Sequence, residues 1–161
     1  MRSEQEMAEA IQRYGDMVRR LCMVHLKNYA DTEDIFQTVF LKYALTSVSF
    51  DSTEHEKAWL IRVTLNESKR LLCSPWRRHT APLADYEASL SWETPAQEDL
   101  FQAVMNLPRK YRLPLYLYYY EGYAVREIAL LLRRKPSTVQ TQLARGREQL
   151  QHILQEEWSY E

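Results

Sequence analysis

The chain has 161 residues, of which 45% are hydrophobic and 27% are charged, and its formal net charge is −1. This composition, with only three glycines, indicates a folded, helix-rich protein and excludes a disordered or collagen-like chain. No apolar run approaches the roughly 20 residues that a membrane span needs, and the N-terminal stretch lacks the apolar core of a signal peptide. We therefore expect a cytoplasmic protein with no membrane insertion of its own.

The first two predicted helices form an antiparallel pair. Ser3 and Glu6 have the spacing of a capping box, and apolar residues then recur at intervals of three and four, which predicts an amphipathic helix from Gln5 to about Lys27. Asp31 is predicted to cap the next helix, whose sequence is TEDIFQTVFLKYAL. The buried face of that helix is expected to contain Ile35 and Val39, with Phe36 and Tyr43 as further candidates.

A third predicted helix lies in a stretch where basic residues far outnumber acidic ones. The preceding stretch TSVSFDSTEHE has no apolar period and is rich in turn formers, so it is predicted to be a loop. Thr53 and Glu56 have capping-box spacing for a helix over residues 57–73. Residues 57–78 contain six basic residues and a single acid, Glu67. Such a run favours an anionic partner such as nucleic acid, although the residues alone leave a solvated helix face open.

The next stretch, APLADYEASLSWETPAQED, has five acids and no base. The segment over residues 74–93, which contains the first part of this stretch, predicts a flexible or extended linker. A second helical domain is expected to follow, because Thr94 offers a cap, Pro95 suits the first helical position, and Gln97 completes a capping box. Leu107 and Pro108 interrupt the helical pattern before the next helix begins.

Three further helices are predicted in the C-terminal half. The stretch RKYRLPLYLYYYEGY predicts a tyrosine-rich helix that ends at Gly122, with a kink or a late start at Pro114. Helices over residues 124–132 and from Pro136 to about Leu154 carry facing apolar stripes, as a helix-turn-helix requires. The whole chain is thus predicted to be all-α, with about seven helices and no strand, although the last two helices could also form an ordinary helical hairpin.

Two sets of motifs resemble the sigma-70 family of RNA polymerase sigma factors, in its small extracytoplasmic-function group. DTEDIFQTVFLKYA with KAWLIRVTLNESKRLL is similar to region 2 of that family, and LPRKYRLPLYLYYYEGYAVREIALLL with TVQTQLARGREQL is similar to region 4. The resemblance implies two small helical domains: residues 1–76 for core polymerase and the minus-10 element, and residues 94–161 for the minus-35 element. Residues 77–93 would be the acidic linker, which in the family threads toward the polymerase active-site and RNA-exit channels.

The resemblance also assigns roles in the first domain. The helix after Asp31 would dock on the clamp helices of the largest polymerase subunit, through Asp31, Asp34, Gln37 and Phe40 or Leu41. The acidic start of that helix is also explained by the helix dipole alone. The basic helix would contact the minus-10 element through Arg62, Asn66, Lys69 and Arg70. Asn66 is the expected base reader, because an amide both donates and accepts, and residues 49–55 would form the loop that selects a flipped base.

In the second domain the last helix would enter the major groove of the minus-35 element. Ser137 and Thr138 are expected near phosphate, and the expected base-facing residues are Gln140, Thr141, Ala144 and Arg145. The chain departs from the family pattern at Ala124, where serine or threonine is common, and at the turn over residues 133–135, where a glycine is common. Gln140 and Gln142 stand where basic residues are frequent. Glutamine pairs with adenine, so Gln140 predicts a different base preference.

No catalytic, metal or cofactor site is predicted. Cys22 and His25 lie one helical turn apart, but Cys73 and His79 have the wrong spacing to complete a zinc site, and both cysteines are expected to be free thiols. The expected partners are core polymerase, at its clamp helices and flap, promoter DNA and an anti-sigma factor. Two alternatives stay open: a sigma-like interaction protein that reads DNA weakly, and an unrelated helix-turn-helix regulator.

Overall fold

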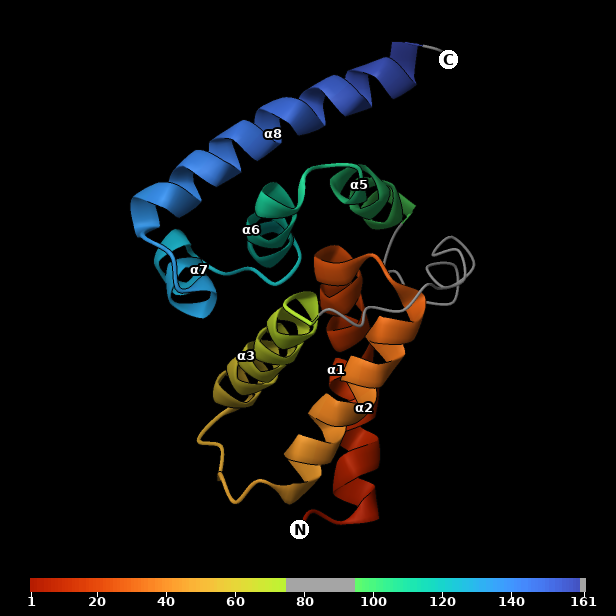
Figure 1. Ribbon diagram of the computed structural model, residues 1–161, viewed down its shortest axis with the longest axis vertical. Helices are drawn as coiled ribbons and strands as arrows, with labels where there is room; N and C mark the ends of the chain where they lie inside the picture. The colour runs from red at the N-terminus through yellow and green to blue at the C-terminus, as the bar shows by residue number, and fades with distance from the viewer. Residues whose placement is uncertain (75–94, 160–161) are drawn as a thin grey trace. The chain divides into compact units, whose positions relative to one another are not determined.

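The structure, a computed structural model, describes residues 1–74 and 95–159. These residues form seven α-helices and no strand, and the chain divides at Ser91 and Trp92 into two compact units. The predicted all-α fold with two helical domains is therefore confirmed (Figure 1). The acidic linker predicted over residues 77–93 lies outside the described residues.

The first unit contains α1 (Glu4–Leu26), α2 (Tyr29–Leu45) and α3 (Thr53–Leu72). Each of these helices packs on the other two, so one core lies between them (Figure 1). Burial of this core stabilises the bundle through the removal of apolar surface from water. Its fully buried side chains include Val18, Leu21, Met23, Val24, Val39, Leu60 and Ile61.

Two helix starts in the first unit differ from the prediction. Asn28, not Asp31, caps α2, because its side-chain oxygen accepts the Asp31 backbone N–H at 2.9 Å. The helix therefore begins almost one turn earlier, and Asp31 becomes a buried residue of its first turn. Ser52 rather than Thr53 caps α3, since its hydroxyl accepts the His55 backbone N–H at 3.1 Å. The Ser3 cap of α1 is confirmed.

The second unit contains α5 (Pro95–Met105), α6 (Arg109–Tyr119), α7 (Val125–Leu132) and α8 (Pro136–Ser159). The long α8 crosses α5, α6 and α7 and closes their shared core (Figure 1). Large side chains that are almost fully buried in this core are Phe101, Leu115, Tyr116, Leu117, Ile128 and Leu143.

Glycine and proline shape the packing of α6 against α8. Gly146 lets the two helices approach closely, because an added Cβ there would lie 2.8 Å from Leu115 Cδ1. Pro114 lies inside α6, which continues past it to Tyr119 rather than starting late. Gly122 does not end the helix itself but occupies the following turn with a φ of +73°, a conformation that favours glycine. Within the described residues no helix is both long and apolar enough to cross a membrane.

Candidate nucleic-acid interface

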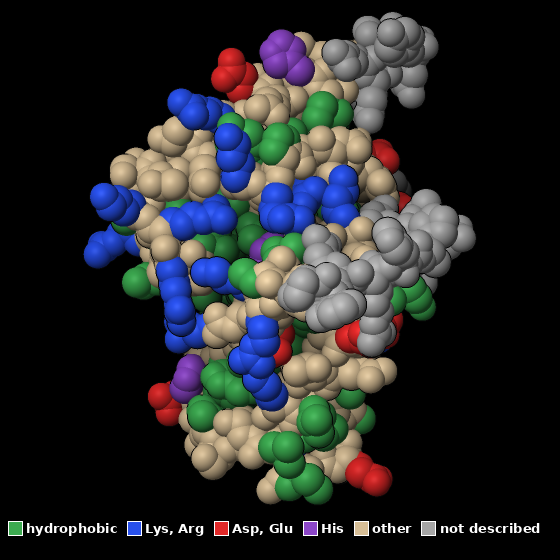
Figure 2. Space-filling model, viewed as in Figure 1, with side chains coloured by type: hydrophobic (Ala, Val, Ile, Leu, Met, Phe, Trp, Pro, Cys, Tyr) green, Lys and Arg blue, Asp and Glu red, His purple; other side chains and the backbone are tan. Residues whose placement is uncertain are grey.

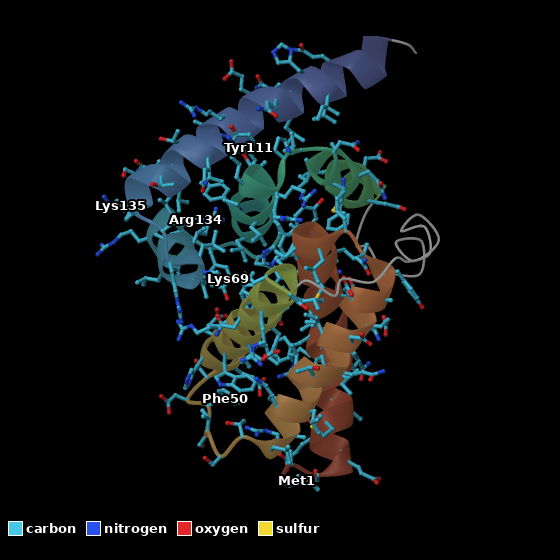
Figure 3. All side chains as sticks on the ribbon, in the orientation of Figure 1. Met1, Phe50, Lys69, Tyr111, Arg134 and Lys135 are labelled. Carbon is cyan, nitrogen blue, oxygen red and sulfur yellow. The ribbon has the colours of Figure 1, made fainter. Side chains whose placement is uncertain are left out.

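The basic helix of the first unit presents its predicted DNA-contact residues on one face. Arg62, Asn66 and Lys69 are exposed and follow one another at intervals of four and three, so they form a single stripe along α3. Arg70 is exposed beside Lys69, which is labelled near the C-terminal end of α3 in Figure 3. Figure 2 shows Lys and Arg side chains gathered over this part of the surface. The arrangement suits binding of a polyanion.

Glu67 is the acid of α3 that lies among the stripe residues, and it is turned away from them, while Glu54 and Glu56 lie in the first turn of the helix. The Glu67 residue is only 9% exposed, and its carboxylate forms an ion pair with Lys42 of α2. The second carboxylate oxygen lies 3.8 Å from Arg70 Nη1. Glu67 therefore ties α3 to α2 and offsets part of the Arg70 charge, while Arg62 and Lys69 remain directed to solvent.

The loop between α2 and α3 is joined to the start of the stripe by aromatic rings. Phe50, in the loop, packs edge-on against His55 and Trp59 at centroid distances of 5.2 and 5.7 Å. Its ring is also nearly parallel to that of Tyr43, with centroids 6.1 Å apart. Trp59 is half-buried, as expected of a residue that packs within this cluster. These ring contacts join the loop to the first two turns of α3.

The proposed polymerase-docking residues of α2 do not all reach the surface. Asp31 is 1% exposed and Phe40 is 4% exposed, so the structure does not offer either side chain to a partner. Both face the bundle because α2 packs against α1 on one side and α3 on the other. Asp34 and Gln37 are exposed, and Leu41 is 60% exposed on the same face. This leaves a polar rim beside one apolar anchor.

The closing pair of helices in the second unit is a helix-turn-helix with the expected division of faces. Ile128 and Ala129 of α7 are buried, and so are Val139, Leu143 and Leu150 of α8. The opposite face of α8 is open to solvent. All six residues predicted to face the minus-35 element are exposed, namely Ser137, Thr138, Gln140, Thr141, Ala144 and Arg145.

A groove of about 340 Å³ lies beside this face, between the first turns of α6 and α8. It brings the exposed cations Lys110 and Arg145 to one concave surface without an acidic residue. Sequence reasoning missed Lys110, because only the packing of α6 on α8 places it beside the recognition helix. The complete lining is Lys110, Tyr111, Ser137, Thr138, Thr141, Gln142 and Arg145.

The unusual turn between α7 and α8 consists of Arg133, Arg134 and Lys135, the last two of which are labelled in Figure 3. Arg133 caps α7 in the left-handed region, with φ 55° and ψ 47°, where glycine would be unstrained. Arg134 is half-buried, and its Nη1 donates to Gln142 Oε1 at 2.8 Å and to the Lys110 carbonyl at 3.5 Å. Lys135 is exposed next to the first turn of α8.

The Arg134 contacts explain two departures from the family pattern together. Pro114 has no N–H to donate to the Lys110 carbonyl one turn earlier, and the Arg134 guanidinium approaches that carbonyl instead. A basic residue in place of Gln142 would repel Arg134, whereas glutamine accepts its hydrogen bond. Burial lowers the pKa of Arg134. The Arg134 guanidinium is therefore engaged in contacts within the protein.

The described titratable groups include no metal centre. Among residues 1–74 and 98–155 no cluster of three His, Cys, Asp or Glu side chains could hold a metal ion. Cys22 is buried, and desolvation raises the pKa of its thiol to about 12, against a smaller lowering effect from a hydrogen bond with Ser68. Cys73 is exposed, and neither cysteine is in a disulfide. His79 lies outside the described residues.

Family models match both halves of the chain. Residues 10–78 match the model described as Sigma-70 region 2, and residues 97–150 match the model described as Sigma-70, region 4. Together the two models match more than half of the chain, in the order of the two structural units.

Named relatives agree with this assignment. The chain is 26% identical to the ECF RNA polymerase sigma factor SigW of Bacillus subtilis, over 92% of this chain and 89% of that protein. It is 28% identical to the ECF RNA polymerase sigma factor SigE of Mycolicibacterium smegmatis, over 91% of this chain but only 60% of the longer relative.

Two solved structures share the fold. The sigma factor RpoE of Bartonella quintana, solved with the anti-sigma factor NepR, is 19% identical with a TM-score of 0.67, over 94% of this chain and 98% of that one. CnrH, solved with the cytosolic domain of CnrY, is 21% identical with a TM-score of 0.62, over 95% and 90%. From its matches to both regions in order, and from these relatives, the chain belongs to the sigma-70 family of RNA polymerase sigma factors, in the extracytoplasmic-function group.

Proposed function

We propose that this chain is a transcription initiation factor that binds core RNA polymerase and directs it to a small set of promoters. The observation that supports the proposal is that the predicted DNA-contact residues are exposed both on α3 and on α8. The two units that contain these helices match regions 2 and 4. Residues 1–76 would bind core polymerase and the minus-10 element, and residues 94–161 would read the minus-35 element. Residues 77–93 would connect them.

At the minus-10 element, α3 holds the non-template strand after the duplex opens. Arg62, Lys69 and Arg70 neutralise phosphates, and Asn66 hydrogen-bonds an exposed base through its amide. The loop over residues 49–55 selects the flipped base, with Phe50 and His55 as its aromatic groups. Opening a duplex costs a few kcal/mol per base, which such stacking and hydrogen bonding must offset.

At the minus-35 element, α8 enters the major groove with its N-terminal turns first. Ser137 and Thr138 lie near phosphate, and the base-facing residues are Gln140, Thr141, Ala144 and Arg145. Gln140 favours adenine and Arg145 favours guanine, from the geometry of their bidentate pairs. Lys110, across the groove of about 340 Å³ from Arg145, adds a phosphate contact from α6.

Core polymerase would dock on the exposed face of α2 through Asp34, Gln37 and Leu41, at the clamp helices of the largest subunit. The second unit would bind the flap. This places the protein in the cytoplasm with polymerase and promoter DNA, and an anti-sigma factor would compete for the same surfaces. The chain performs no covalent chemistry itself, because polymerase forms the phosphodiester bonds.

Run-off transcription with purified core polymerase tests the proposal. Genomic DNA fragments are transcribed with and without the chain, and transcript starts that depend on the chain define its promoters. At such a promoter, Arg62→Ala and Asn66→Ala should each lower open-complex formation. Their matched control is Gln12→Ala, which removes an exposed polar side chain from α1. If the wild type gives promoter-dependent transcripts but Arg62→Ala and Asn66→Ala form open complexes as well as Gln12→Ala does, the proposed role of the α3 stripe is wrong.

The departures at the turn support one second candidate, an interaction protein that binds polymerase but reads DNA weakly. Arg133 is strained in the left-handed region, and Ala124 provides no side-chain cap for α7. Both features lower the stability of α7 relative to the same helix with a glycine at 133 and a serine at 124. Polymerase binding without a promoter-dependent transcript would support that candidate. An unrelated helix-turn-helix regulator is no longer supported, because residues 10–78 match region 2.

A further inference from the structure

Arg2 lies outside every stretch that carries the family resemblance. Its side chain nevertheless forms hydrogen bonds to the end of α2 and to the loop before α3. Its Nη1 donates to the carbonyls of Tyr43 and Thr46 at 2.7 and 3.1 Å, and its Nη2 donates to the carbonyl of Val48 at 3.0 Å. Its backbone N–H donates to the Ala44 carbonyl at 3.1 Å. One residue thus satisfies four carbonyls.

These carbonyls are the groups that a helix end and a loop leave without partners. Tyr43 and Ala44 belong to the last turn of α2, whose carbonyls have no intrahelical donor beyond the helix end. The Thr46 and Val48 carbonyls belong to the loop itself. A cation at a helix C-terminus also complements the helix dipole. Arg2 therefore fixes the path by which the chain leaves α2.

The guanidinium of Arg2 also lies on the aromatic cluster of the loop. Its central carbon is 4.3 Å from the ring centroid of Tyr43 and 5.2 Å from that of Phe50. Phe50 in turn packs on His55 and Trp59, at the start of the α3 stripe. Cation–π contacts of this kind favour one ring arrangement over others. A continuous set of contacts joins Arg2 to the face of α3 on which Arg62 lies.

We infer that Arg2 is a positioning residue for minus-10 recognition: it holds residues 46–52, which include the start of the loop over residues 49–55, in the shape that presents Phe50, beside His55 of the first turn of α3, to a flipped base. This inference rests on the proposed function of that loop. Arg2 is inferred to act within the protein rather than on DNA, because three of its five guanidinium N–H groups donate to carbonyls of α2 and the loop. Planar geometry is essential to the role, since a lysine ammonium cannot span carbonyls of three residues and lie flat on a ring.

The structural part of the inference is tested on the full chain without polymerase. Amide hydrogen exchange over residues 46–52 should be at least about tenfold faster in Arg2→Ala, and only partly slowed again in Arg2→Lys, because lysine restores a charge without the fork. Arg13→Ala is the matched control, since it removes an exposed α1 guanidinium that lies over the ring of its neighbour Tyr14. Exchange in Arg2→Ala equal to that control would overturn the inference.

The functional part uses core polymerase and a promoter at which the wild type initiates. Arg2→Ala should lower open-complex formation on duplex DNA by about tenfold and narrow the discrimination between minus-10 variants, while a premelted template restores most transcription. Core binding should stay at the wild-type value, because Asp34, Gln37 and Leu41 are untouched. An equal loss on duplex and premelted templates, or unchanged base discrimination, would overturn the positioning role.

These measurements separate the inference from the proposed function. If the wild type never initiates at a promoter while loop exchange responds to Arg2→Ala, the proposed function fails and so does the inferred role in recognition, although the loop contacts are real. If the wild type initiates and Arg2→Ala behaves as Arg13→Ala, only the inference about Arg2 fails.

Discussion

Substitution of Arg134 by alanine should loosen the recognition helix without removing a phosphate contact. The change deletes the 2.8 Å hydrogen bond to Gln142 Oε1 and the 3.5 Å contact with the Lys110 carbonyl. A hydrogen bond that involves a charged group contributes about 1.5–3 kcal/mol, and partial exposure of Arg134 places the expected loss at about 1–2 kcal/mol. Arg134→Lys should lose about half as much, because an ammonium group cannot reproduce the fork.

Amide hydrogen exchange of the full chain measures this loss locally. A chain with two compact units does not unfold in one two-state step, so a global midpoint would mix the contributions of both units. A local loss of about 1.4 kcal/mol appears as about tenfold faster exchange over residues 136–145. Gln142→Ala removes the same hydrogen bond, so the double variant should be less destabilised than the sum of the single ones, by about 1 kcal/mol.

The dependence of promoter binding on salt decides whether Arg134 touches DNA. Lys110→Ala should lower the salt slope by about one, as expected when one phosphate contact is removed, whereas Arg134→Ala should leave the slope unchanged. Exchange over residues 136–145 at the wild-type rate, or a salt slope reduced as in Lys110→Ala, would refute the internal role of Arg134.

Four further predictions concern the second unit. Arg133→Gly should stabilise α7 by about 0.5–1 kcal/mol, which amide exchange over that helix would report as a slower rate. The reason is that relief of about 1–2 kcal/mol of left-handed strain exceeds the cost of the greater freedom of glycine in the unfolded chain. An unchanged exchange rate would contradict this prediction. Ala124→Ser should stabilise the same helix by about 1 kcal/mol through a side-chain cap, and Ala124→Val, which cannot cap, is its control. Gly146→Ala should destabilise the packing of α6 on α8 by about 1–3 kcal/mol, because the new Cβ meets Leu115 Cδ1 at 2.8 Å, whereas Ala144→Gly on the exposed face should cost only about 1 kcal/mol. Gln140→Arg should shift minus-35 preference from adenine toward guanine in binding to a library of sites, and an unchanged preference would show that Gln140 faces no base.

Much of the candidate interface could be predicted because helical periodicity is local. The spacing of Arg62, Asn66 and Lys69 by four and three fixes a common face for any regular helix, and the same holds for the exposed residues of α8. Periodicity identified Ile35, Phe36, Val39 and Tyr43 as the buried face of α2, but it missed Asp31 and Phe40, which also lie against neighbouring helices. A helix that packs on two sides buries a wider arc than a one-sided amphipathic pattern predicts.

The sequence by itself determined the helices found in residues 1–74 and 95–159, the order of the two helical units and the family, because capping residues, apolar periods and motifs are properties of short stretches. Only the tertiary structure decided the roles of Arg2 and Arg134. Arg2 donates hydrogen bonds to carbonyls more than 40 residues away along the chain. Arg134 approaches the carbonyl of Lys110, which has no helical N–H donor because Pro114 stands four residues later. An arginine has five N–H donors, and the residues near it in the sequence do not determine which acceptors they will find. Its partners are therefore known only once distant segments have packed together.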